Sequence, residues 1–106
     1  MLAGVLAFAP AAHADDNQLD ITVRWSDGRS STYTQTIRDD DGRDIAARPD
    51  TVGGKYLEAA RKKLAERLGY TAAVYGPDYW KIPQVSKWFF ELKDPSANRV
   101  IASNRP

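Results

Sequence analysis

Lys55 to Gly69, KYLEAARKKLAERLG, is the stretch that decides the fold. At 100° per residue its apolar residues fall on one side of a helix, and most of its charged residues point away from that side. Gly69 stands just after the last turn, where a residue with positive φ commonly ends a helix. The stretch therefore predicts an amphipathic helix that begins near Lys55 and buries one face. That face consists of Leu57, Ala60, Leu64 and Leu68.

Two segments on the N-terminal side of this helix have the patterns of strands. Leu19 to Trp25, LDITVRW, alternates between apolar and polar residues, which is typical of a half-buried strand. Ser31 to Arg38, STYTQTIR, is rich in β-branched and aromatic residues. Between them, Asp27-Gly28 favours a hairpin turn. We therefore expect an N-terminal β-hairpin.

Further strands are predicted after the helix. Lys87 to Lys93, KWFFELK, and Arg99 to Ser103, RVIAS, are joined by turn residues from Asp94 to Asn98. Thr71 to Tyr75 is a candidate for one more short strand. The expected fold class is therefore α+β, with an N-terminal hairpin, one amphipathic helix and then two to three antiparallel strands. The helix is expected to pack on one face of a small sheet.

The order of elements in the C-terminal half resembles that of the small PepSY-type domains of exported bacterial proteins. The residues that carry the likeness are a strand with a tryptophan (Trp88 to Leu92), an Asp94-Pro95 turn and an apolar last strand around Val100-Ile101. It covers about half the chain, and the glycine expected in the final turn is absent, with Asn98 near its place. A hairpin, helix and strands in this order also fit a β-grasp arrangement. Likeness at the level of the fold says little about function.

The first residues have the features of a secretory signal peptide. Met1 to Ala14, MLAGVLAFAPAAHA, is apolar, is too short to span a bilayer, and ends with Ala12 and Ala14 in an A-x-A arrangement. No positively charged residue precedes the apolar run, and a buried N-terminal helix or strand is the alternative. We expect cleavage after Ala14, and residues 15–106 to form a single small α+β domain in the periplasm or outside the cell.

The residue types in 15–106 restrict the possible functions. This part has no His, Cys or Met, because His13 and Met1 both precede it. It therefore offers no Ser-His-Asp or Cys-His catalysis and no metal site built on those residues. All 15 basic and 14 acidic residues lie after Ala14, so the net charge of +1 gives no general argument for nucleic acid. We expect no enzyme, no cofactor, no nucleic-acid partner and no membrane span.

The aromatic loop from Gly76 to Pro83, GPDYWKIP, is the main candidate site. Prolines stiffen it, and Tyr79 and Trp80 on a stiff loop form a contact surface with little conformational entropy to lose. With Tyr75 and Lys81 they are predicted to bind a protein or glycan of the cell envelope. The chain would then be a small exported binding or inhibitory module. The alternative is that Trp80 folds back to cap the core.

An acidic segment, Asp39 to Asp44, is a weaker candidate for a metal site. Asp39, Asp41 and Asp44 have the hard oxygen ligands that calcium prefers, in what reads as a turn around Gly42. Their spacing does not match an EF-type loop, and a solvated acidic turn is the favoured interpretation. A calcium-binding structural protein remains an alternative function.

Another alternative is a hydrolase that uses only carboxylates. Its acid and base would come from a set of four residues and would face each other across a cleft, about 5 to 9 Å apart. The set is Asp20, Asp78, Glu91 and Asp94. The sequence gives no indication of an oligomeric state.

Overall fold

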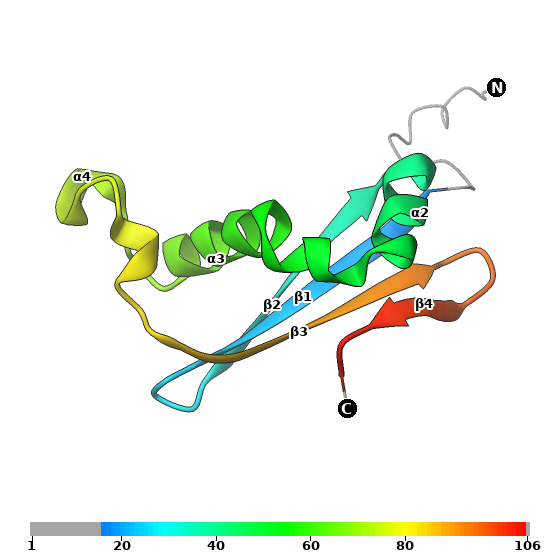
Figure 1. The fold of residues 1–106 in the computed structure, drawn as a ribbon. Helices are drawn as coiled ribbons and strands as arrows, with labels where there is room; N and C mark the ends of the chain where they lie inside the picture. The colour runs from blue at the N-terminus through cyan, green and yellow to red at the C-terminus, as the bar shows by residue number, and fades with distance from the viewer. Residues whose placement is uncertain (1–15, 106) are drawn as a thin grey trace, which may run out of the picture.

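The computed structural model of the 106-residue chain describes residues 16–105, and the predicted signal peptide, residues 1–14, lies outside them. The chain begins with two strands, continues through the helices and ends with two more strands, as Figure 1 shows. In order they are β1 (Asn17–Trp25), β2 (Ser30–Ile37), α2 (Asp39–Ala47), the 3-10 helix η1 (Pro49–Gly53), α3 (Lys55–Arg67), α4 (Ala72–Tyr75), the 3-10 helix η2 (Tyr79–Lys81), β3 (Val85–Asp94) and β4 (Arg99–Ser103).

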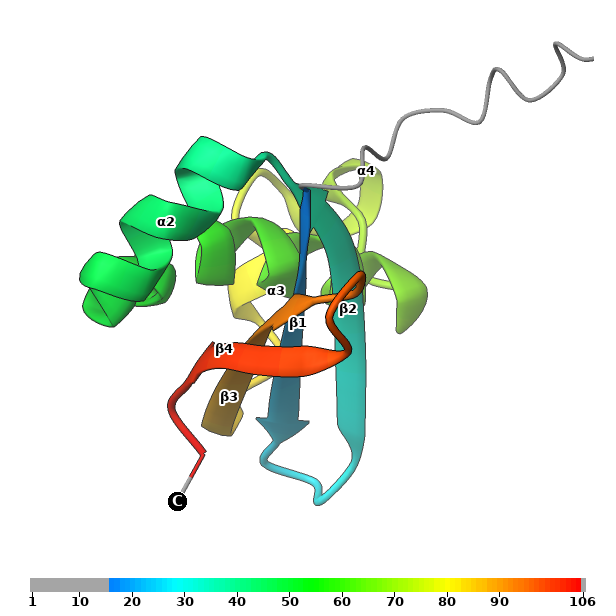
Figure 2. The ribbon, with the colours of Figure 1, turned by 90° about the vertical axis from the view of Figure 1, so that its right-hand side faces the viewer.

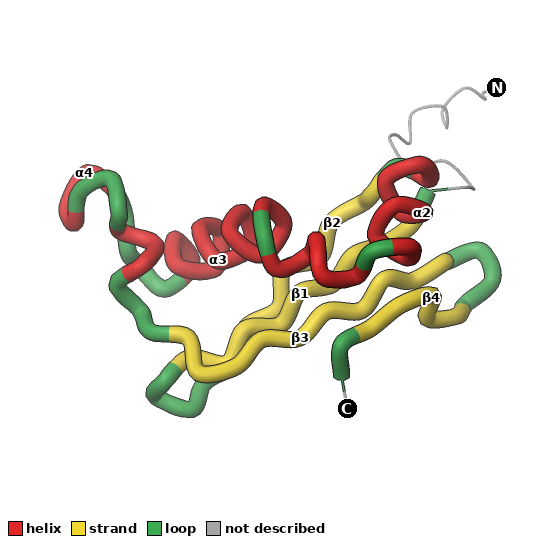
Figure 3. Tube along the Cα trace, in the orientation of Figure 1, coloured by secondary structure: helices red, strands yellow, loops and turns green. Residues whose placement is uncertain are grey.

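The strands form one antiparallel sheet in the order β2-β1-β3-β4, which confirms the predicted α+β class (Figure 3). The N-terminal hairpin is also confirmed, with Gly28 at a φ of 92° in its turn. β1 lies between β2 and β3, so that Ile21 is opposite Tyr33 on one side and Phe90 on the other. The first strand of the chain is therefore central in the sheet.

Helices α2 and α3 cover one face of the sheet, as the view in Figure 2 shows. The predicted stripe of α3 is confirmed: Ala60 and Leu64 are fully buried, and Leu57 and Leu68 pack partly buried against the core. The helix ends as predicted, because Gly69 has a φ of 99°. The core between helices and sheet consists of Leu19, Ile21, Val23, Trp25, Ile37, Ile45, Val52, Ala60, Leu64, Phe90 and Leu92.

The prediction of a turn from Asp39 to Asp44 is wrong, because these residues begin helix α2. Three aspartates in its first turn interact favourably with the positive end of the helix dipole. Arg43 pairs with Asp39 one turn away, and Arg48 pairs with Asp44. Ile45 anchors the helix in the core. The sheet is therefore covered by two helices rather than by the one predicted.

The short strand predicted at Thr71 to Tyr75 is also wrong, because Ala72–Tyr75 forms helix α4. Gly69 and Gly76 flank it with φ values of 99° and 87°, so the chain turns sharply on each side. In Figure 1, α4 lies beyond the end of the sheet, where there is no strand for it to pair with. All four of its residues are exposed.

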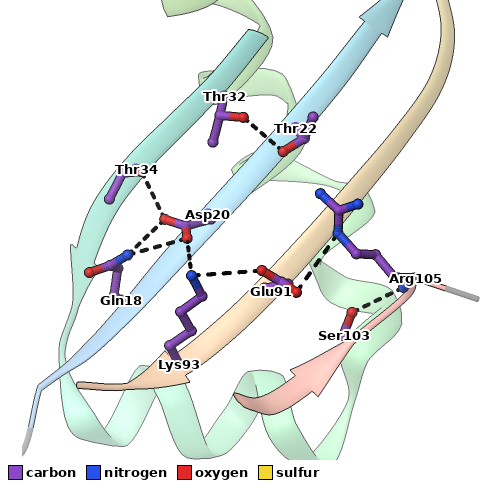
Figure 4. Close-up of polar contacts among 9 residues, drawn as sticks. All are labelled: Gln18, Asp20, Thr22, Thr32, Thr34, Glu91, Lys93, Ser103 and Arg105. Atoms are coloured by element: carbon purple, nitrogen blue, oxygen red, sulfur yellow. Dashed lines mark hydrogen bonds and ion pairs between the residues drawn. The ribbon is translucent and has the colours of Figure 1, made fainter. Parts of the chain in front are cut away.

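The other face of the sheet is open and mainly polar. Asp20 accepts hydrogen bonds from Gln18 Nε2 (3.0 Å) and Thr34 Oγ1 (2.8 Å), and it pairs with Lys93 Nζ at 3.0 Å (Figure 4). Burial disfavours the charged carboxylate, but the hydrogen bonds from Thr34, Lys93 and Gln18 outweigh it and lower the pKa of Asp20. Lys93 also approaches Glu91 at 3.7 Å. These contacts tie the three longer strands together on the solvent side.

Candidate binding site

The loop of residues 76–83 is held against helix α3 by two side chains of that helix. The Tyr79 hydroxyl donates a hydrogen bond to the Glu66 carboxylate, at 2.5 Å. Arg61 Nη2 donates to the backbone carbonyls of Lys81 (3.2 Å) and Pro83 (3.3 Å). The loop is therefore positioned by the polar flank of α3, at a distance from the core residues of the sheet.

Trp80 lies on α3 and is surrounded by cations. Its ring centre is 5.5 Å from the Arg61 guanidinium carbon, 5.3 Å from Lys62 Nζ and 5.1 Å from Lys81 Nζ. All three distances are in the range of cation–π attraction. The side chain is half-buried and is outside the hydrophobic core and the residues packed against it. Trp80 therefore covers helix α3 rather than the core.

A pocket of about 280 Å³ opens beside Trp80, between η1, α3 and the start of β3. Leu57 and Val85 give it apolar walls, and Glu58, Arg61 and Trp80 form its polar and aromatic side. This volume is several times the roughly 30 Å³ that a water molecule occupies in the liquid, so the pocket is large enough for a side chain of a ligand.

The remaining predicted binding residues lie at the same end of the molecule. Tyr75 is on α4, 49% exposed, with its ring centre 5.1 Å from that of Tyr70. Lys81 pairs with Asp78 at 3.7 Å. Val74 and Ile82 are exposed as well, so within residues 16–105 three of the four large exposed apolar side chains lie between 74 and 82. Exposed apolar groups gathered in one place indicate an interaction surface.

Sequence reasoning missed Arg61 and Leu57 as parts of this site. They are four residues apart on α3 and therefore project from the same side of the helix. Arg61 is the first of three consecutive basic residues, Arg61 to Lys63. Basic residues toward the C-terminal end of a helix are favoured by the helix dipole, so nothing in the sequence marked Arg61 as a binding residue. Its Nε is buried without a hydrogen-bond partner, and burial lowers its pKa.

The three aspartates of the weak calcium candidate do not form one group. Asp39 is paired with Arg43, and Asp44 with Arg48. Asp41 is two residues from Asp39 on the same helix, and positions two apart face different sides. Within residues 16–105, no group of three or more His, Cys, Asp or Glu side chains could hold a metal ion.

The carboxylates of the hydrolase alternative lie in different surroundings. Asp20 and Glu91 are opposite each other on neighbouring strands of the open face, and Lys93 bridges them. Asp94 accepts a hydrogen bond from the Ser96 hydroxyl, which lowers the pKa of Asp94. Asp78 is in the aromatic loop. A general acid needs a raised pKa, whereas the pKa values of Asp20 and Asp94 are lowered.

Comparison of this chain with protein-family models, with curated proteins and with solved structures gave no match. Among the helices of residues 16–105, none has the length and apolar character needed to cross a membrane.

Proposed function

We propose that this chain is a small exported module of the bacterial envelope that binds a partner, or inhibits it, without catalysis. The binding surface is the aromatic loop 76–83 together with the pocket beside Trp80. The A-x-A arrangement that ends at Ala14 supports export. The lack of His and Cys in residues 15–106 supports a non-catalytic role.

The observation that carries the proposal is the placement of Trp80. This large aromatic side chain is outside the core, on a loop that helix α3 holds through two hydrogen-bonding side chains, Arg61 and Glu66. Because the loop is already held in place, Trp80 is a preorganised contact. Tryptophan and arginine beside a pocket are also the residue types that contribute most of the energy of protein interfaces. Exposed Ile82 and Val74 extend the surface around them.

Site-specific photocrosslinking in the cells that produce the protein tests this proposal. A benzoylphenylalanine at position 82, within the loop, is compared with one at position 36 on the open face of the sheet. We expect a covalent adduct of defined mass from position 82, little or none from position 36, and loss of the adduct when Trp80→Ala is added.

Equal adducts from both positions, or an adduct that survives Trp80→Ala, would show that the loop is not the binding surface. Circular dichroism of Trp80→Ala is the control for folding, and we expect a native spectrum because Trp80 is outside the core. Export is tested separately by N-terminal sequencing of the periplasmic protein, for which we expect Asp15 as the first residue.

A further inference from the structure

The three cations around Trp80 differ in their partners. Lys62 has Glu58 as a carboxylate partner at 3.9 Å, and Lys81 has Asp78 at 3.7 Å. Within residues 16–105, Arg61 pairs with no carboxylate and donates only to backbone carbonyls. Glu66, another carboxylate at the loop, accepts a hydrogen bond from the Tyr79 hydroxyl. Of the three cations beside the Trp80 ring, Arg61 is therefore the one that can take a carboxylate from a partner without breaking an ion pair.

The helices differ in charge as well. Helix α3 contains five basic and two acidic residues, whereas residues 39–53, which form α2 and η1, contain two basic and five acidic. Their net charges are +3 and −3. In Figure 1, α2 lies at the opposite end of α3 from the aromatic loop. A partner that docks at the loop meets the positive helix, and complementary charge favours an acidic one.

The pocket indicates that the partner also has an apolar side chain. Its walls at Leu57 and Val85 suit an aliphatic or aromatic side chain. The Glu58 carboxylate in its lining is paired with Lys62, so Arg61 is the charged group there that suits a carboxylate of the ligand. A neutral glycan would use Trp80 by stacking on its ring, but it would supply no carboxylate to Arg61, which pairs with none within residues 16–105. The observations therefore favour a protein ligand over a neutral sugar.

We infer that the partner presents an acidic protein segment, with one apolar side chain that enters the pocket beside Trp80 and carboxylates that lie against Arg61, Lys62 and Lys81. This inference rests on the proposed function and defines the chemistry of its partner.

A library of random 12-residue peptides displayed on phage supplies the probes for a test. The library is selected on the wild-type protein after removal of phage that bind Trp80→Ala. We expect the selected peptides to be enriched in Asp and Glu around an apolar residue. A labelled selected peptide is then titrated against the protein by fluorescence anisotropy, and its affinity should fall with added salt.

Two charge-reversed variants with the same net charge give a matched comparison. Lys62 and Lys81 have side chains that are 44% and 57% exposed, so Lys62→Glu/Lys81→Glu should fold normally. We expect it to weaken peptide binding by about tenfold or more. Lys63→Glu/Lys87→Glu, at two exposed lysines that do not contact Trp80, should change the affinity less than about twofold.

The inference is overturned if no peptide is enriched, if the enriched peptides lack an acidic bias, or if both charge-reversed variants bind alike. Binding to purified peptidoglycan sacculi that is unaffected by Lys62→Glu/Lys81→Glu would point to a glycan instead. If crosslinking from position 82 succeeds but the selected peptides have no acidic bias, the proposed binding surface is supported and only the inference of an acidic partner is wrong. If crosslinking and selection both fail, the surface itself is wrong.

Discussion

The guanidinium of Arg61 lies 5.5 Å from the ring centre of Trp80, and the same side chain donates hydrogen bonds to the carbonyls of Lys81 and Pro83. One residue of helix α3 therefore holds the loop in place and borders the aromatic ring that the loop presents. The position of Trp80 depends on a helix residue nineteen positions earlier in the chain.

Arg61→Ala should release the loop without unfolding the sheet. It removes two hydrogen bonds from a charged donor, and we expect a loss of about 1–2 kcal/mol in the free energy of unfolding, measured by urea denaturation. Hydrogen exchange of the amides in 79–84 should speed up, while that of β1 stays slow. Arg61→Lys, which keeps the charge, is the control and should have a smaller effect. Unchanged exchange in Arg61→Ala would show that the loop is held by other contacts.

The cations around Trp80 should be visible in fluorescence quenching. Trp25 is buried, so quenching reports mainly on Trp80 and Trp88. Iodide is attracted to the three cations and caesium is repelled, so iodide should quench the wild type more strongly. Trp80→Phe should remove most of this difference, and neutral acrylamide serves as the reference quencher. Equal quenching by both ions would argue against a positive environment at Trp80.

Asn17 and Gly42 pack so closely that a side chain at position 42 would have to displace that of Asn17. A Cβ on Gly42 would lie 1.9 Å from Asn17 Oδ1. Gly42→Ala should therefore destabilise the fold by about 1–3 kcal/mol, measured as the free energy of unfolding in urea. In an Asn17→Ala background the nearest atom becomes the Cβ of residue 17, at 3.4 Å, and most of the cost of Gly42→Ala should disappear. Additive effects of the two substitutions would contradict this contact.

The contact between Asn17 and Gly42 also shows what the sequence did not reveal. Local patterns predicted the strands and helix α3, because alternation and the stripe from Leu57 to Leu68 depend only on neighbours in the chain. Gly42 reads as a turn residue by local rules, and its role depends on a strand residue 25 positions away. The same limit explains α2, where the burial of Ile45 by the sheet overrides the turn-like sequence.

The stability of the open face of the sheet should depend on pH through Asp20. The pKa of Asp20 in the folded protein is lower than the ordinary value of 3.8, so its ionised form stabilises the fold above that pH. This contribution is lost as the pH falls through the lower pKa of the folded state. Asp20→Asn should therefore be less stable than the wild type at pH 6, and the difference should shrink below about pH 4. A difference that is the same at both pH values would contradict the lowered pKa.

For the binding site, the sequence predicted the aromatic loop, and the structure adds the pocket beside it and the helix that holds it. Tyr79, Trp80 and Lys81 were predicted together because they are adjacent in the chain. The pocket could not be predicted this way, because it combines Gly53, Leu57 and Val85 from three separate segments. That Trp80 covers helix α3 rather than the core could not be predicted either, because it depends on contacts with Arg61 and Lys62, which are distant in the chain.

The opposite charges of α2 and α3 have a consequence for how the molecule meets a partner. Helix α2, of net charge −3, lies beyond one end of α3, of net charge +3, and this separation contributes an electric dipole moment along the direction of α3. In the field of a negatively charged partner the molecule experiences a torque that turns the end with Trp80 forward before the surfaces touch. Orientation of this kind raises the fraction of collisions that are productive, and it weakens as salt shortens the range of the field.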